Sequence, residues 1–185
     1  DTHADMNRAL DELRNRGIAD AHCVMHTHTT AGMAVASSAG EAWRRALATD
    51  PQSAFGGVVA FNTVVDKATA EEMVGLFLEV IVAPSFHDEA LKVFAAKKNL
   101  RVVELPVSHG EQGLDYKCVR GGFLVQDRFQ FDPSEEGWRV PTVRHPTEAE
   151  WSDLRFGWAG VAAVKSNAIL LVRHEAAIGI GAGQM

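Results

Sequence analysis

The sequence is poor in cysteine, and it has neither a long apolar run nor an excess of basic residues. Its two cysteines, Cys23 and Cys118, lie far apart and lack the paired spacing of a zinc site. Two isolated cysteines fit a reduced, cytoplasmic protein. No apolar stretch reaches the roughly 20 residues that a membrane helix needs, and the polar residues 1–17 do not resemble a signal peptide. We therefore expect a cytoplasmic protein with no membrane partner.

The charge balance is acidic: 18 Lys and Arg face 24 Asp and Glu, for a net charge of −6. An acidic chain lacks the basic footprint of a nucleic-acid-binding protein, so we expect no nucleic-acid partner. With 46% hydrophobic and 23% charged residues, the 185-residue chain can build one real core. We expect a single domain over residues 1–185, cut from something larger, because a helical pattern is already under way at the beginning.

Apolar residues at helical spacing alternate with short runs of β-branched residues, which predicts an α/β domain with a layered mixed sheet. Capping patterns (Ser or Thr followed by Glu three positions on) predict helix starts at Ser38, Thr69 and Thr147. Helices are expected over 5–16, 38–49, 69–78, 87–98 and 147–165. Strands are expected over 22–26, 55–62, 79–83, 100–105, 168–172 and 177–180, with a strand pair turning at 121–122 and a loop over 127–146.

Three histidines stand close together near the first expected strand. His22, His26 and His28 could share one face, because side chains two apart on a strand point the same way. Three imidazoles could bind zinc, as in a metal-dependent hydrolase, but no carboxylate or cysteine pair stands at ligand spacing nearby. A general acid or base role for one histidine suits the chemistry better, since imidazole titrates near working pH.

Glycine-containing segments offer further candidates. Residues 29–32 (TTAG) could present backbone N–H groups to a phosphate or carbonyl oxygen, or form an ordinary turn. Gly56 and Gly57 allow a ligand close to the backbone, or simply a tight beginning of a strand. The Gly-x-Gly-x-Gly pattern at 179–183 has no helix after it, so a dinucleotide loop is not supported.

Two charged residues flank expected strands. Glu79 immediately precedes an apolar strand, and Lys165 stands at the end of the last expected helix. A lysine beside apolar residues can have a lowered pKa that serves catalysis, although a lysine at this position can equally cap the helix electrostatically.

Six strings in the sequence occur in the order found in a known enzyme family. They are ATDPQSAFGGVVAFN (48–62), EVIVAPSFHDEAL (79–91), KKNLRVVE (97–104), GGFLVQDR (121–128), VKSNAIL (164–170) and IGIGAGQM (178–185). Together they resemble the transformylase region of the AICAR transformylase/IMP cyclohydrolase family, over roughly residues 31–185. AICAR is the ribonucleotide of aminoimidazole carboxamide.

The resemblance implies a cytidine-deaminase-like α/β half of an AICAR transformylase, without the deaminase zinc and with no other metal. It implies an enzyme that transfers a formyl group from 10-formyltetrahydrofolate to AICAR in purine (IMP) biosynthesis. It also implies a homodimer with its sites at the subunit interface. This chain would be the first half of the transformylase region, without the cyclohydrolase domain and the second half.

In that family a Lys-His pair within KHxNPCGVA carries catalysis, and the matching stretch here is 26–34 (HTHTTAGMA). Without a gap, His26 replaces the lysine and Thr27 the histidine; with a one-residue shift, Met25-His26 replaces the pair. The lysine is absent in both alignments. The resemblance implies His26 or His28 as proton shuttle and Lys165 as a charge-stabilising group. It implies substrate binding by Thr27, Gly32, Gly56, Gly57, Glu79 and Asn167.

The alternative is a non-catalytic relative that keeps the fold and a weakened nucleotide site. The change of the Lys-His pair favours this alternative, whereas the retained KSN and GAGQM strings favour an enzyme.

Overall fold

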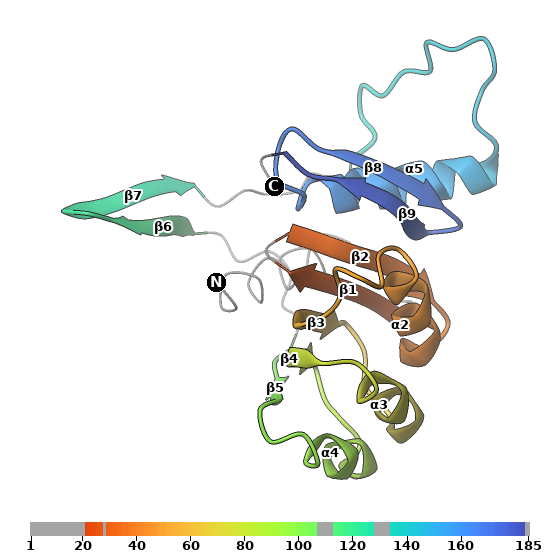
Figure 1. Ribbon diagram of the computed structural model, residues 1–185. Coiled ribbons are helices and arrows are strands. Elements are labelled where there is room, and N and C mark those ends of the chain that lie inside the picture. The colour runs from red at the N-terminus through yellow and green to blue at the C-terminus, as the bar shows by residue number, and fades with distance from the viewer. Residues whose placement is uncertain (1–20, 28, 107–112, 128–133, 184–185) are drawn as a thin grey trace.

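The computed structural model describes residues 21–27, 29–106, 113–127 and 134–183, and within them one large sheet dominates (Figure 1). In sheet order its strands are β5 (Arg101–Glu104), β4 (Leu78–Ala83), β3 (Gly57–Phe61), β1 (Ala21–Thr27), β2 (Thr29–Ala36), β9 (Ala176–Gly181) and β8 (Ile169–Arg173). The β3–β4 and β4–β5 pairs are parallel, and the remaining pairs are antiparallel. The expected mixed sheet of an α/β fold is confirmed.

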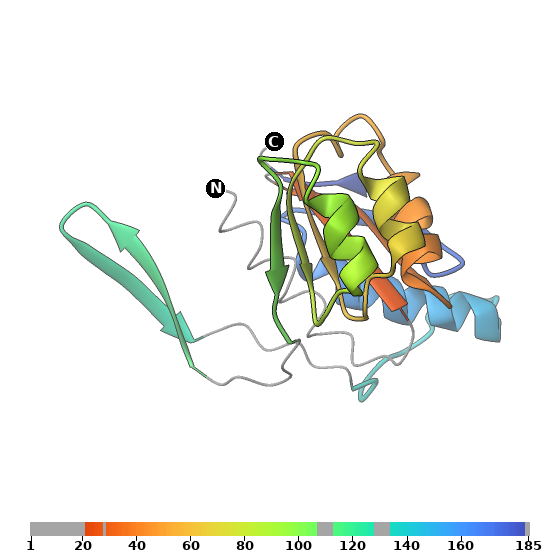
Figure 2. The same cartoon turned by 90° about the horizontal axis from the view of Figure 1, so that it is seen from below.

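Helices cover the sheet on both faces (Figures 1 and 2). On one face lie α2 (Ala39–Leu47), α3 (Lys67–Met73) and α4 (Asp88–Phe94), and on the other lies α5 (Glu148–Val161). Among the described residues, no helix has the length and apolar character needed to cross a bilayer.

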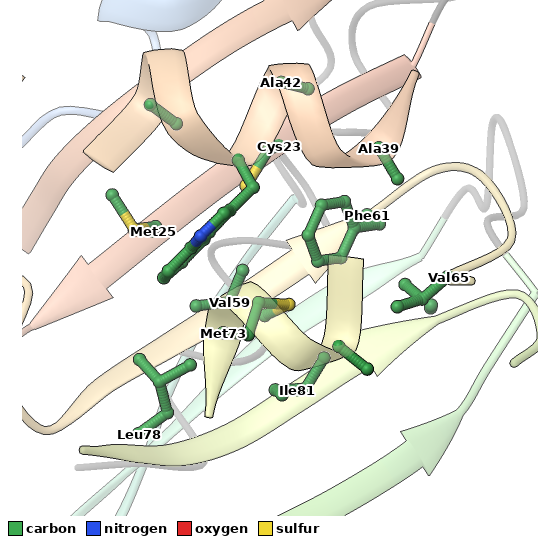
Figure 3. Packing of buried hydrophobic residues seen from close by; sticks show 14 of the residues in the cluster. Cys23, Met25, Ala39, Ala42, Val59, Phe61, Val65, Met73, Leu78 and Ile81 are labelled. Carbon is green, nitrogen blue, oxygen red and sulfur yellow. The ribbon is translucent and has the colours of Figure 1, made fainter. Parts of the chain in front are cut away.

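The strands bury both faces, which explains their nearly continuous apolar sequences. On the face of α2 to α4, Trp43, Phe61 and Met73 are almost fully buried, and Figure 3 shows the latter two beside Ile81. The opposite cluster includes Val58 and contains Phe156 of α5. Successive residues of one strand therefore pack into different hydrophobic clusters, one on each face of the sheet, as strand geometry requires.

Side-chain caps set the helix beginnings. Ser38 accepts a hydrogen bond from the Glu41 N–H at the start of α2, and Thr147 with Glu150 forms a complete capping box at α5. These two predicted starts are confirmed. The predicted start at Thr69 is wrong, because Asp66 caps α3 by accepting from the Thr69 N–H at 2.9 Å. Asp is as good an N-cap as Thr, and the hydrogen bonds from Thr69 lower the pKa of Asp66.

Several other predicted boundaries are corrected. Residues 29–32, predicted as a turn, belong to β2, where the β-branched threonines suit an extended chain. Helices α3, α4 and α5 end at Met73, Phe94 and Val161, short of the predicted 78, 98 and 165. The helix predicted over 5–16 lies outside the described residues.

The turn between β8 and β9 is held by two helices. His174 and Glu175 have φ angles of 52° and 55°, in the left-handed region that favours glycine. The Asp153 carboxylate of α5 accepts hydrogen bonds from both backbone N–H groups, at 3.0 and 2.6 Å. From α2, the Arg45 guanidinium donates to the carbonyl oxygens of His174 and Val35. These hydrogen bonds stabilise the turn and offset the unfavourable free energy of its left-handed backbone.

A second, two-stranded sheet stands apart from the main one in both views (Figures 1 and 2). It consists of β6 (Leu114–Val119) and β7 (Gly122–Asp127). As predicted, the chain reverses at the glycine pair, where Gly121 has a φ of 89°. We refer to this hairpin, residues 114–127, as the arm.

We expect Glu175→Gly to stabilise the protein by about 1 kcal/mol, because glycine adopts the left-handed conformation without steric cost. Urea unfolding measures the change. The matched control is Glu89→Gly, in the ordinary helical backbone of α4, which should destabilise by about 1 kcal/mol. Destabilisation by Glu175→Gly would contradict the assigned turn geometry.

The Glu150 carboxylate at the start of α5 should titrate far below its ordinary range. Hydrogen bonds from Arg144, followed by those from Thr147, lower its pKa from 4.5 to about 2. Because the pKa of Glu150 is depressed in the folded state, its ionised carboxylate contributes to the free energy of unfolding above pH 4.5. That contribution is lost as the pH falls through about 2.

Carboxyl-resolved NMR titration measures this pKa directly. Arg144→Ala should raise the Glu150 pKa, whereas Arg139→Ala, which removes a charge from the same loop, should leave it in place. An unchanged titration in Arg144→Ala would show that the ion pair is not the cause.

Candidate functional site

Several predicted site residues lie along one edge of the main sheet. The antiparallel register pairs His26 of β1 with Val58 of β3, so the end of β1 meets the beginning of β3. Strand β4 runs parallel to β3 and begins beside it, with Leu78 paired to Gly57. Glu79 follows Leu78 directly. We refer to this edge, from the start of β5 to the start of β8, as the site edge.

The C-terminal hairpin adds a further segment to the site edge. Because β9 runs antiparallel to β2, with Ala34 opposite Ala176, β9 ends and β8 begins at this edge. Lys165 and Asn167 immediately precede β8. The Gly183 N–H donates to the Lys165 carbonyl oxygen at 2.8 Å, and a Cβ on Gly183 would lie 2.2 Å from the Ser166 carbonyl oxygen. Glycine is therefore required at position 183, where the string 178–185 contacts the string 164–170.

The candidate residues form two groups rather than one cluster. Five strand spacings separate β4 from β8, or about 24 Å along the edge. His26 and Glu79 belong to the first group, and Lys165 and Asn167 to the second. One small molecule cannot touch both ends of this edge, whereas two ligands lying side by side can.

The histidine candidates are placed only in part. His26 and Thr27 are the last two residues of β1, at the site edge, but their side chains lie outside the described part of the structure. All of His28 lies outside the described residues. Which histidine serves as proton shuttle therefore stays a prediction.

Gly56 and Gly57 lie in a tight turn that leads into β3. The Gly56 φ of 75° is left-handed, and the Gly56 N–H donates to the Phe77 carbonyl oxygen at 2.9 Å. Upstream, the Asp50 carboxylate accepts from the Ser53 N–H at 3.0 Å. The pKa of Asp50 is lowered by its hydrogen bonds with Ser53. The backbone conformation alone therefore favours a glycine at position 56.

An exposed aromatic pair beside Gly56 escaped sequence reasoning. The rings of Phe55 and Phe77 lie 5.1 Å apart in a tilted arrangement, with the residues 67% and 47% exposed. The pair forms a small exposed apolar patch beside the glycine turn. The signal was present within the string SAFGG, where a phenylalanine precedes two glycines.

Glu79 lies near a basic partner. Its carboxylate is 3.8 Å from the guanidinium of Arg101, the first residue of β5, and both side chains are partly exposed. A loose, exposed pair of this kind contributes little to stability. Loss of the contact with Arg101 by itself would therefore cost little.

The hydroxyl of Thr30 is buried and lacks a hydrogen-bond partner within the described structure. The residue is 3% exposed, and in the described structure its Oγ1 has no hydrogen-bond partner. Its backbone lies opposite His26 in the β1–β2 register. A buried hydroxyl without a hydrogen-bond partner destabilises a fold by about 1–3 kcal/mol. Packing therefore does not explain why a threonine stands at this position of the site edge.

Gly32 lies inside β2 rather than at the site edge. A Cβ there would lie 2.1 Å from the Ala46 carbonyl oxygen of α2 and 2.9 Å from the Met25 side chain. Close packing of α2 on β2 therefore explains a glycine at this position, and substrate binding by Gly32 stays a prediction.

A separate groove of about 860 Å³ lies between the loop over 138–146, α5 and β8. The Trp138 ring stacks on Trp151 at 6.0 Å and meets Trp158 edge-on at 5.9 Å. The two-point ion pair of Arg155 with Glu135, at 2.5 and 3.2 Å, fastens the loop to α5. None of the residues predicted from the sequence lines this groove.

Among the described residues, no group of three His, Cys, Asp or Glu side chains could hold a metal ion. The zinc alternative built on His22, His26 and His28 concerns side chains outside that part of the structure.

We expect Gly32→Ala to destabilise the protein by about 2 kcal/mol or more, because the added methyl group forces α2 away from β2. Urea unfolding measures the loss. Gly122→Ala is the control, since nothing lies within 4 Å of a Cβ added there. Equal stability of the two variants would contradict the close approach of α2 to β2.

Comparisons with known proteins give one consistent result. Residues 2–185 match the family model described as AICARFT/IMPCHase bienzyme. The chain is 45% identical over 181 residues to the bifunctional purine biosynthesis protein PurH of Shouchella clausii, covering 98% of this chain and 35% of that protein. The PurH of Thermoanaerobacter sp. is 43% identical, again over 98% of this chain and 35% of that protein. The chain thus spans about a third of the length of these curated relatives.

Among solved structures, RibD of Acinetobacter baumannii is similar, with a TM-score of 0.38 and 15% identity over 55% of this chain and 33% of that one. An overlap of this size supports no argument about fold or function.

Proposed function

Because this chain belongs to the AICARFT/IMPCHase bienzyme family, we propose that it contributes part of a formyltransferase site of purine biosynthesis. The proposed reaction transfers the formyl group of 10-formyltetrahydrofolate to the amine of AICAR. One observation carries the assignment to the site edge. Gly56, Glu79 and Asn167, which match family site positions, come from distant parts of the sequence and share that edge.

The chemistry requires both a base and charge stabilisation. The AICAR amine is conjugated with its ring and carboxamide, and it is therefore a poor nucleophile. Its nitrogen forms a bond to the formyl carbon, and the bond from that carbon to the folate nitrogen breaks. The amine proton passes through His26 to the departing folate nitrogen. Lys165 stabilises the negative charge that develops on the formyl oxygen.

The spacing of the site edge supports a reaction with two substrates. His26, Gly56 and Glu79 form the group that would receive the nucleotide. Lys165 and Asn167, across about three strand spacings of roughly 5 Å each from β1, would face the folate side. Positioning two reactants side by side is itself a large part of group-transfer catalysis.

A specific observation supports the second candidate, a nucleotide-binding relative without turnover. The family's Lys-His pair is replaced at 26–27 by His-Thr, or by Met-His with a shift of one residue. Without that lysine, the charge near the reacting centre is lower by one unit. Nucleotide binding by the glycine turn and Glu79 could survive this change.

An AICAR-dependent change in the folate absorbance spectrum tests the proposal. We expect turnover by the 185-residue chain, reduced in His26→Ala by about 100-fold, the usual contribution of a positioned general base. The matched control is His87→Ala. His87 lies beyond the opposite end of β4, is exposed, and makes no side-chain cap for α4.

Calorimetry with AICAR separates the two candidates. Binding without turnover would support the non-catalytic relative and overturn formyl transfer by this chain. Absence of both binding and turnover, in a folded chain, would contradict a nucleotide site at this edge altogether. Equal activity of His26→Ala and His87→Ala would exclude His26 as the proton shuttle.

A further inference from the structure

The Thr30 hydroxyl differs from the comparable buried hydroxyl of the described structure. Thr30 and Thr69 are both 3% exposed. The Thr69 hydroxyl hydrogen-bonds to the Asp66 carboxylate, whereas the Thr30 Oγ1 has no partner among the described residues. Buried polar groups ordinarily have a hydrogen-bond partner. A hydroxyl for which the described fold supplies none is therefore available to a bound molecule.

Thr30 lies near the middle of the site edge. It is the second residue of β2, the strand that begins at this edge. In the sheet order, β2 stands three positions from β4, which carries Glu79, and two positions from β8, which follows Lys165 and Asn167. At roughly 5 Å per strand, these separations are about 15 Å and about 10 Å. A group that passes from one end of the site edge to the other therefore passes Thr30.

The strand register places Thr30 on the face of the sheet that α5 covers. Thr30 stands in one row with His26 of β1 and Val58 of β3, and residues in one row of a sheet share a face. Val58 packs in the hydrophobic cluster that also contains Val164. Because Val164 directly precedes Lys165, Thr30 is on the same face as the segment that carries this lysine.

A hydroxyl in this position suits a carbonyl oxygen that arrives between the two groups of site residues. In the proposed reaction that oxygen belongs to the formyl group, and it becomes negatively charged when the amine attacks the formyl carbon. A threonine hydroxyl can donate one hydrogen bond, and a donor already held in place stabilises such a charge without reorganisation. In the alignment without a gap, the family string has a proline at position 30. Proline has no side-chain donor, so this hydroxyl is particular to the present chain.

We propose that Thr30 is a substrate-binding residue whose hydroxyl donates a hydrogen bond to the formyl oxygen of the folate donor. This inference rests on the proposed function and adds the residue that holds the transferred group. The hydrogen bond strengthens as negative charge develops on the oxygen, and it therefore stabilises the transition state more than the bound substrate.

Calorimetry with two folates tests the hydrogen bond without requiring turnover. The probes are 10-formylfolate and folate, which differ only in the formyl group. We expect the 185-residue chain to bind 10-formylfolate more tightly. Thr30→Val should reduce this preference about fivefold, as loss of one neutral hydrogen bond does, and Thr30→Ser, which keeps the hydroxyl, should retain it. Thr69→Val is the matched control, since it makes the same change at an equally buried threonine of α3, and it should leave the preference unchanged.

Urea unfolding of the same variants without ligands gives a second readout. Thr30→Val removes a buried hydroxyl that has no partner in the described fold, so it should raise the urea midpoint. Thr69→Val removes a hydroxyl that bonds to Asp66 and should lower the midpoint. A lower midpoint in Thr30→Val would show that the hydroxyl serves the fold itself, and it would overturn the proposal.

The remaining outcomes separate this inference from the proposed function. A wild-type chain with no preference for 10-formylfolate, or a preference that persists in Thr30→Val, would overturn the role of Thr30 even if the chain catalyses formyl transfer. A preference that depends on Thr30 in a chain without turnover would support the hydrogen bond and contradict formyl transfer alone. Failure of both folates to bind would overturn this inference and the folate side of the proposed site together.

Discussion

The pairing of β2 with β9 is the contact on which the arrangement of the candidate site depends. The register there is short, with Ala34 opposite Ala176, and two further hydrogen bonds reinforce it. The Val35 N–H donates to the Glu175 carbonyl oxygen at 2.9 Å, and the Thr49 hydroxyl donates to Ala177 at 2.7 Å. Because this contact joins segments about 140 residues apart in the sequence, it helps to bring the Lys165–Asn167 segment to the edge where β1 ends.

The turn between β8 and β9 shows how that pairing is stabilised. An isolated hairpin with His174 and Glu175 at its turn would have an unfavourable backbone. Here the Asp153 carboxylate takes up both N–H groups, and Arg45 takes up a carbonyl oxygen of the same turn. One hairpin thus connects α5 on one face of the sheet with α2 on the other, and the two faces are held in a fixed relation.

The site edge combines retained and altered features of the family. The left-handed backbone at Gly56 strongly favours glycine, and the close contact of Gly183 with Ser166 leaves no room for a Cβ. The stretch from His26 to Thr30 differs from the family string, and its Thr30 hydroxyl is buried without a partner within the described structure. An unmet polar group in an otherwise well-packed strand is a common sign of a site that binds a ligand or water.

Local rules were sufficient for part of the fold. The caps at Ser38 and Thr147, the reversal at Gly121 and the alternation of helices and strands depend on neighbours within a few residues, and all are confirmed. Local rules failed where two signals competed. Asp66 and Thr69 are both good caps, and the more N-terminal one begins α3. The threonines of 29–32 suit either a turn or a strand, and pairing with β1 made them a strand.

The sequence by itself determined the fold class, the family and most of the residues worth testing. Periodicity, helix caps and family strings are signals that depend only on residues close together in the chain. The tertiary structure decided which of those residues share an edge, that Gly32 meets Ala46 of α2, and that Phe55 and Phe77 stand exposed together. The physical reason is that register and packing are set by partners distant in the chain, whose contacts no local pattern specifies.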